Sequence, residues 1–253
     1  MEYRILGPVQ ASEGGVEIPL EGVKQRSVLA ALLIAEGNLV PDTQLSWYLW
    51  GDRPPVTLTA QLYTHVSRLR GRLGPAVSIV RRTQGYLMPP GDAFFDLSRF
   101  RELAGKGQVE VAAGRYQEGG GLLREALALW RGPVLANVAE HLANTEGPPL
   151  EEARISALAG RIEADLAAGR HPQLLPELTR LVAQHPLHER FRAQLMTALY
   201  RCDRQAEALS LYDHGRRLLG DALGVAPGPL LRAIHEAILT SDPRLHRPPT
   251  QWH

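Results

Sequence analysis

The sequence predicts a mostly α-helical chain, in which an N-terminal winged helix-turn-helix of mixed α and β structure precedes an all-α, tetratricopeptide-like repeat domain. Two observations carry this prediction. An amphipathic helix over 57–74 is followed by a short hairpin over 77–88. Nearer the C-terminus, helical segments recur with a period near 34 residues. The 253 residues are 44% hydrophobic, which is enough for a packed core.

Short β-type segments open the chain between residues 3 and 18, around a Ser-Glu-Gly-Gly turn. Two helices follow, over 24–36 and about 42–51, and each ends at a glycine. We expect Asp42 to cap the second helix, because a short acidic side chain can accept a hydrogen bond from free amide groups there. The residues expected in the core include Trp47, Trp50 and Trp130.

The helix expected over 57–74 has two contrasting faces. One carries Leu58, Leu62, Val66, Leu69 and Leu73. The opposite face is small and polar, with one long guanidinium at Arg68. From Arg53 to Tyr86 there are six arginines and no acidic residue, although the whole chain has a net charge of only +1. A helix entering a DNA major groove needs such a face. The alternative is an ordinary solvated surface helix.

Individual roles follow from position along this helix and the hairpin. Arg68 is the best candidate for a base contact, since a guanidinium pairs with guanine through two hydrogen bonds; a phosphate contact is its alternative. Weaker candidates for base contacts are Thr64 and Gln61. The candidate phosphate contacts are Arg70, Arg72, Lys24, Arg26 and Arg53. The candidate wing residues are Arg81, Arg82 and Gln84. Neighbours in a strand point to opposite sides, so only one of the two wing arginines is expected to face DNA. For Lys24 and Arg26, a tolerated surface charge is an equal alternative.

Pro89-Pro90-Gly91-Asp92 is the best candidate for a domain boundary. We therefore predict a winged-helix DNA-binding domain over 1–90, a helical domain over 94–240 and a flexible tail over 241–253. The helical domain should hold helices over about 95–113, 117–130 and 150–168, with an irregular segment over 134–148. The segment 169–182 aligns with 203–216, which indicates paired helices of tetratricopeptide type.

Other classes of function find little support. The single cysteine, Cys202, excludes an internal disulfide. His185 and His188 have a spacing known from metal sites but lack further ligands, so we expect no metal and no cofactor. No catalytic arrangement stands out, and we expect no enzyme activity. Without a signal peptide or a long apolar run, the expected location is cytoplasmic, at the nucleoid, with no membrane partner.

The sequence resembles the Streptomyces antibiotic regulatory protein family of bacterial transcription activators. The resemblance extends to about residue 240 and rests on an ordered set of motifs. In the first half these are LGPV at 6–9, KQRSVLAALL at 24–33, LWGDRPP at 49–55, HVSRLRGRLG at 65–74 and RRTQGYLM at 81–88. In the second half they include DLSRF at 96–100, LREALALWRGPVL at 123–135, RIEADLAAGRH at 161–171 and LGVAPGPLLRAIHEAIL at 223–239.

The resemblance implies an OmpR-type winged helix followed by a bacterial transcriptional activation domain. It implies binding to direct repeats at promoters by tandem protomers or a homodimer, and recruitment of RNA polymerase through its sigma factor and other subunits. The regulated genes would be secondary-metabolite clusters, and the chain looks like the small form. Ala60, Tyr63 and His65 depart from the family pattern, which puts the operator sequence in doubt. The alternative function is a tetratricopeptide interaction scaffold that does not read DNA.

Overall fold

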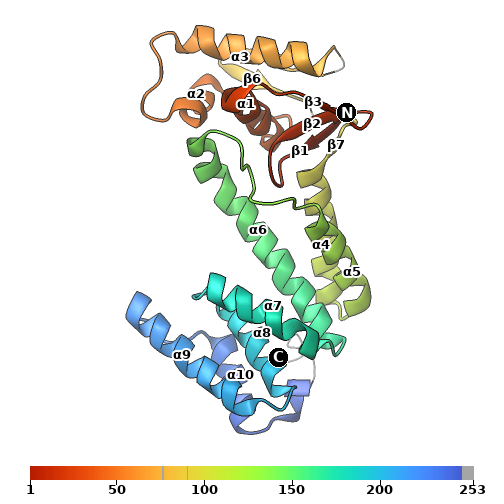
Figure 1. Cartoon of the computed structure of the whole chain (residues 1–253), viewed down its shortest axis with the longest axis vertical. Helices are drawn as coiled ribbons and strands as arrows, with labels where there is room; N and C mark the ends of the chain where they lie inside the picture. The colour runs from red at the N-terminus through yellow and green to blue at the C-terminus, as the bar shows by residue number, and fades with distance from the viewer. Residues whose placement is uncertain (76, 90, 247–253) are drawn as a thin grey trace. The chain divides into compact units, whose positions relative to one another are not determined.

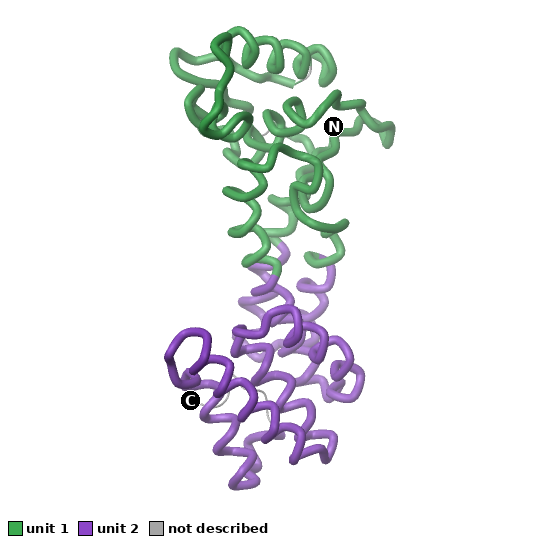
Figure 2. Tube along the Cα trace, turned by 60° about the vertical axis from the view of Figure 1, so that its left-hand side comes forward, with its two compact units in different colours: residues 1–102, 126–154 green, residues 103–125, 155–253 purple. Residues whose placement is uncertain are grey.

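The computed structural model describes residues 1–75, 77–89 and 91–246. It contains two compact units (Figure 2): unit 1 comprises residues 1–102 and 126–154, and unit 2 comprises 103–125 and the chain from 155 onward. Of the predicted boundary, Pro90 lies outside the described residues. The limits of the units do not coincide with that boundary, because residues 126–154 join unit 1. Arg131 donates its amide to Leu6 O, and Asn137 accepts the Val9 amide at 2.7 Å.

Unit 1 contains two small sheets (Figure 1). The first has the order β3-β2-β1-β7, in which β1 (Glu2–Arg4), β2 (Gln10–Glu13) and β3 (Val16–Ile18) are antiparallel neighbours and β7 (Phe94–Phe95) runs parallel to β1. The second has the order β4-β6-β5, formed by β4 (Val40–Pro41), β6 (Gly85–Leu87) and β5 (Val80–Arg82). The sequence did not predict β4 or β7, because two-residue strands carry no periodicity of their own.

Three helices complete the winged helix-turn-helix of unit 1. They are α1 (Gly22–Ile34), α2 (Asp42–Trp50) and α3 (Leu58–Leu73). The expected core tryptophans have three different outcomes. Trp130 is buried, Trp50 is half-buried, and Trp47 is 43% exposed and contacts the His141 ring. Tyr48 takes the inward position instead, between the buried Leu45 and Leu49. The prediction for Trp47 was therefore wrong, because it followed residue type and not the helical face.

The helix α6 (Glu140–Ala167) corrects the prediction of an irregular segment over 134–148 for residues 140–148, whereas 134–139 lie outside any helix or strand, as predicted. It runs through Pro148 and Pro149, residues that remove backbone donors and usually end helices. Leu142 and Leu150 are both buried, on either side of the prolines. Burial of this face outweighs the local preference for a loop, which is why the expected break at Gly147 does not occur.

Unit 2 is built from paired helices, which confirms the tetratricopeptide-like prediction. It takes the C-terminal parts of α4 (Asp96–Ala112) and α6 and the N-terminal part of α5 (Tyr116–Ala128). The helices α7 (His171–Gln184), α8 (Glu189–Tyr200), α9 (Gln205–Leu223) and α10 (Pro229–Leu239) follow. The helices α7 and α9 begin 34 positions apart, in agreement with the predicted repeat. Their aligned residues Leu178 and Tyr212 are both buried in one core with Phe191 and Met196.

A buried ion-pair network also stabilises unit 2. Asp165 is 6% exposed and accepts hydrogen bonds from three guanidinium groups. The donors are Arg124 at 2.9 Å, Arg161 at 3.2 Å and Arg170 at 2.9 Å. Arg161 is itself buried and also binds Glu177, so the network joins α6 to α7.

Part of the predicted flexible tail is ordered. Pro243–His246 forms a short 3-10 helix, and its Leu245 is fully buried in the core of unit 2. The carbonyl of Leu245 accepts a hydrogen bond from Arg201 at 2.7 Å. The remaining tail, 247–253, lies outside the described residues. Within the part of the chain that the structure describes, every helix is too short or too polar to cross a membrane.

Candidate nucleic-acid interface

The helix α3 has the two faces that its sequence predicts. Leu62, Val66, Leu69 and Leu73 are at most 2% exposed and pack into unit 1, while Leu58 is half-buried. The opposite face is exposed along its whole length: its residues are Ala60, Thr64, Ser67, Arg68 and Gly71. Figure 1 draws α3 along the outer edge of unit 1.

The three candidate base contacts differ in how free their polar atoms are. The Arg68 side chain is exposed and has no hydrogen bond or ion pair with any described residue. Thr64 donates its hydroxyl to Ala60 O at 2.8 Å, and Gln61 donates to Thr57 Oγ1 at 3.1 Å. For Gln61 or Thr64 to donate to a base, each must first break its hydrogen bond within the chain. Arg68 has no such bond to break among the described residues.

Arg70 binds within the chain, although its sequence position suggested a phosphate contact. Its guanidinium donates twice to Ile79 O, at 3.0 and 2.5 Å, and lies 6.0 Å from the centre of the Tyr86 ring. These bonds connect the last turns of α3 to the residue just before β5. The structure therefore gives Arg70 the role of positioning α3 against the hairpin.

Arg72 and Arg53 are the more accessible of the candidate phosphate contacts. Arg72 forms an ion pair with Glu21, but both side chains remain largely exposed. Arg53 lies in the loop between α2 and α3 and has no side-chain partner among the described residues. An exposed pair of this kind is weak, about 0–1 kcal/mol, so a phosphate can replace Glu21 at little cost.

Lys24 and Arg26 have their charged groups occupied inside unit 1. Lys24 Nζ donates to Leu49 O and lies 4.5 Å from the centre of the Trp50 ring. Burial lowers the pKa of Lys24. Arg26 donates to Asn137 O at 2.8 Å and to Leu20 O at 3.0 Å. These contacts within the chain differ from the predicted phosphate contacts.

The two arginines of the wing differ in their contacts, as expected for neighbours in a strand, whose side chains point to opposite sides. Arg81 makes a two-fold pair with Asp42, at 2.5 and 2.7 Å, and lies over the Tyr86 ring. This pairing raises the pKa of Arg81. Asp42 is therefore a partner of the wing and makes no side-chain cap of α2, which corrects the predicted N-cap. Arg82 is exposed and has no partner among the described residues.

The tip of the wing requires its glycine. A side chain at Gly85 would place a Cβ 2.2 Å from Val40 O, because β4 and β6 approach closely there. The adjacent Gln84 has an exposed side chain, and its carbonyl accepts the Asp42 amide at 2.8 Å. The hairpin turn is thus attached to the start of α2, with Arg82 and Gln84 pointing outward.

Tyr63 and His65 lie beside the expected contacts, and they differ in exposure. Tyr63 is 62% exposed on the edge of the polar face of α3, where an aromatic ring has no packing role in the chain. His65 is half-buried beside Trp50. Burial, and then the charges of Lys24 and Arg68, lower the pKa of His65, so its ring is neutral near pH 7. The sequence had singled out Tyr63 and His65 as departures from the family pattern but gave neither of them a contact.

Comparison with known proteins identifies relatives along nearly the whole chain. The family model described as "Bacterial transcriptional activator domain" matches residues 95–239. The regulatory protein AfsR of Streptomyces coelicolor is 42% identical over 246 residues, which are 97% of this chain and 25% of AfsR. The regulatory protein DnrI of Streptomyces peucetius is 35% identical over 258 residues, covering 98% of this chain and 95% of DnrI. The chain thus spans about a quarter of the length of AfsR.

A solved structure agrees with the fold. Mycobacterium tuberculosis EmbR, in complex with a low-affinity phosphopeptide, matches with a TM-score of 0.89 and 36% identity. The match covers 96% of this chain and 65% of that chain. The winged helix with an exposed α3, the paired helices of unit 2 and these relatives agree. The chain belongs to the Streptomyces antibiotic regulatory protein family of transcriptional activators.

Proposed function

We propose that the chain binds double-stranded DNA in a sequence-specific manner, with α3 in the major groove and the wing against the backbone. The observation that carries this proposal is the acid-free face of α3, with the unpaired guanidinium of Arg68 at its middle. A guanidinium there reaches guanine O6 and N7 through two hydrogen bonds. Thr64 and Gln61 are secondary base contacts, and Tyr63 contacts the edge of the groove.

Phosphate contacts would come from side chains that frame α3. Arg53 precedes the helix, Arg72 lies in its last turn, and Arg82 with Gln84 forms the tip of the wing. Their guanidinium groups are exposed, so binding DNA costs little desolvation. Arg70 and Arg81 act by holding α3 and the wing in place through Ile79 and Asp42.

We further propose that tandem protomers, or a homodimer, occupy direct repeats at promoters of secondary-metabolite genes. Recruitment of RNA polymerase holoenzyme, including its sigma factor, would follow from that position and place the chain at the nucleoid. Membership of the activator family and the stacked helices of unit 2, which suit protein partners, support this part of the proposal. The function is regulatory and needs no cofactor.

Fluorescence polarisation with duplexes from promoters next to the chain's own gene tests DNA binding. Arg68→Ala is expected to cost about 1–3 kcal/mol, roughly 5- to 150-fold in affinity, and to relax selectivity at one base pair. Arg180→Ala is the matched control, since Arg180 is an exposed arginine of α7 in unit 2. Footprinting on the same duplexes gives the repeat spacing and the number of protomers bound.

The outcomes separate the possible roles. An equal loss of affinity on every sequence would reassign Arg68 to a phosphate contact. Absence of salt-dependent binding to any of these promoters would refute DNA recognition and favour the interaction scaffold, because phosphate contacts make affinity depend on salt. In vitro transcription with purified polymerase holoenzyme then tests activation, which should require the direct repeats.

A further inference from the structure

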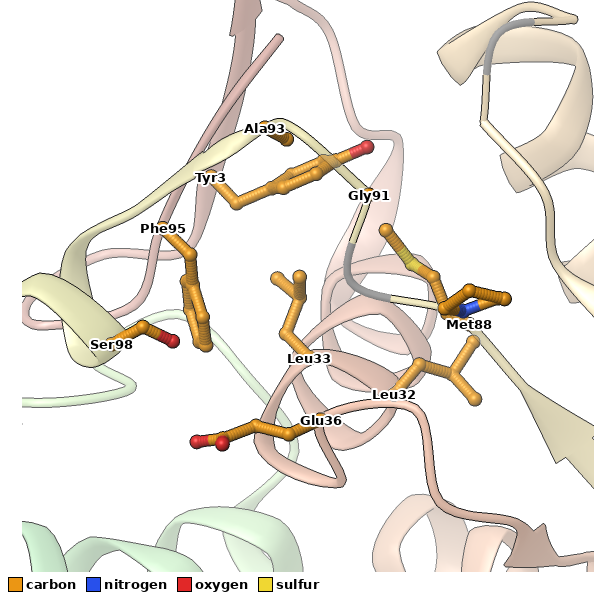
Figure 3. A pocket seen from close by; sticks show the side chains of 10 residues that line it. Tyr3, Leu32, Leu33, Glu36, Met88, Gly91, Ala93, Phe95 and Ser98 are labelled. Atoms are coloured by element: carbon orange, nitrogen blue, oxygen red, sulfur yellow. The ribbon is translucent and has the colours of Figure 1, made fainter.

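The outer face of α3 presents chemically different groups in a fixed order, unlike the hollow elsewhere in unit 1. That hollow, of about 260 Å³ beside α1, is lined mainly by apolar side chains, among them Leu33, Met88 and Phe95 (Figure 3). Glu36, the charged residue that lines it, is paired with Arg101. An apolar hollow of this kind selects no particular ligand, whereas an ordered face can distinguish one base pair from another.

The N-terminal half of this face differs from its C-terminal half. Ala60 and Thr64 lie one turn apart near the centre of the face, and both are exposed. The ring of Tyr63, which is 62% exposed, extends the apolar surface on one flank. Arg68 follows one turn after Thr64 and brings the positive charge. The face therefore changes from apolar to cationic along α3.

The hydroxyl of Thr64 is already occupied within the helix. It donates to Ala60 O at 2.8 Å. This bond fixes the side-chain rotamer and uses the one proton that the hydroxyl can donate. Without breaking it, the side chain can offer a base its methyl group or accept a hydrogen bond, but it cannot donate one.

The base edges of the major groove narrow the choice of contact for this pair of residues. The acceptor atoms of guanine and adenine need a donor, and the Thr64 proton is used. The amino groups of cytosine and adenine need an acceptor, which the side chain of Ala60 lacks. The 5-methyl group of thymine is the apolar group in the groove, and both Ala60 and Thr64 can contact it through a methyl of their own.

We propose that Ala60 and Thr64 together recognise the 5-methyl group of a thymine, so that the operator holds a thymine close to the guanine expected at Arg68. The contact rests on the proposed binding of DNA by α3. One turn of α3 separates Thr64 from Arg68, a rise of about 6 Å, and base pairs lie about 3.4 Å apart. The thymine should therefore lie within about three base pairs of that guanine.

Deoxyuridine tests this methyl group alone, because it differs from thymidine only in lacking it. The operator located by footprinting is prepared with one thymine position of the repeat replaced at a time, and binding of the full chain is measured by fluorescence polarisation. At one position the replacement should weaken binding by wild type about 2- to 5-fold, since one methyl loses a contact shielded from water.

Two variants at position 64 separate the methyl from the hydroxyl. Thr64→Ser removes the methyl, so it should weaken binding to the thymine operator about 2- to 5-fold and reduce the difference between thymine and deoxyuridine. Thr64→Val keeps the methyl and removes the hydroxyl, so it should retain that difference. Thr179→Ser is the matched control and should bind like wild type, because Thr179 is an exposed threonine of α7 whose hydroxyl donates to Leu175 O at 2.8 Å. Circular dichroism checks that each variant is folded.

The outcomes separate this contact from the proposed DNA binding. Equal affinity for thymine and deoxyuridine at every position of an operator that binds in a salt-dependent manner would overturn the thymine contact alone. A deoxyuridine effect of the same size in wild type and Thr64→Ser, or one that disappears in Thr64→Val, would overturn it as well. Absence of salt-dependent binding to any promoter duplex would overturn it together with the proposed function.

Discussion

Replacement of Asp96 by alanine should destabilise unit 1 more than most single substitutions. Asp96 is 1% exposed at the start of α4. Its carboxylate accepts the Ile5 amide at 2.9 Å and the Leu6 amide at 3.0 Å, and it lies 3.8 Å from the guanidinium of Arg131. One side chain thus joins the end of β1, the first turn of α4 and the segment after α5.

The size of the effect follows from these contacts. Ile5 and Leu6 are fully buried, so alanine at position 96 leaves two amide donors without partners. Each unsatisfied buried donor costs about 1–3 kcal/mol, which gives about 2–6 kcal/mol in total. The ion pair with Arg131 adds little at 3.8 Å, since Arg131 also donates to Pro8 O. A typical domain has a free energy of unfolding of about 5–15 kcal/mol, so the loss is a large part of it.

Urea unfolding measured by circular dichroism gives the change in the free energy of unfolding. A chain with two compact units need not unfold in one transition, so hydrogen exchange of the Ile5 and Leu6 amides supplies a local measurement. Both amides should exchange faster in Asp96→Ala. Asp92→Ala is the matched control, because Asp92 is exposed and should change stability by no more than about 0.5 kcal/mol. If Asp96→Ala unfolds and exchanges like this control, the reasoning fails.

Three further predictions concern charge. Burial raises the pKa of Asp96 above its usual 3.8, so the folded chain binds this proton more tightly than the unfolded chain. The stability of wild type relative to Asp96→Asn should therefore be greatest below pH 3.8 and fall as pH rises through the raised pKa, measured by urea titrations at several pH values. Asp165→Ala removes one of the two carboxylates that buried Arg161 binds, the other being Glu177, and should cost roughly 3–5 kcal/mol of unfolding free energy, whereas Asp165→Asn should cost less. Arg82→Ala should reduce the salt slope of DNA binding by about one in polarisation titrations, and Arg81→Ala should leave it unchanged; equal slopes would contradict this division of the wing.

Much of the interface could be predicted from local sequence. A helical stripe of leucine and valine fixes which face of α3 is buried, and the 3.6-residue period then places Arg68 outward without any tertiary information. Strand alternation likewise predicts that the side chains of Arg81 and Arg82 point to opposite sides of the hairpin. It does not say which of them faces outward, because that depends on Asp42, a residue far away in the sequence.

The sequence could not predict which basic side chains donate their hydrogen bonds to other residues of unit 1. Lys24 and Arg26 bind backbone carbonyls of Leu49, Asn137 and Leu20, and backbone acceptors leave no residue-specific pattern in a sequence. The same holds for Arg70 and Ile79 O. The error over α6 has a different cause: proline preferences describe an isolated segment, and burial of the leucines beside them changed the outcome.

The structure separates the arginines between Arg53 and Tyr86, a stretch without acidic residues, into those that bind within the chain and those that do not. If all six arginines served DNA, none would need a partner in the chain. Instead Arg70 and Arg81 bind Ile79 O and Asp42, while Arg68 and Arg82 are unpaired among the described residues. Under the proposed DNA binding, a carboxylate in this stretch would pair with the free arginines and compete with phosphate. The two sets also differ in their expected salt dependence, because only an arginine that replaces counterions on DNA changes the slope.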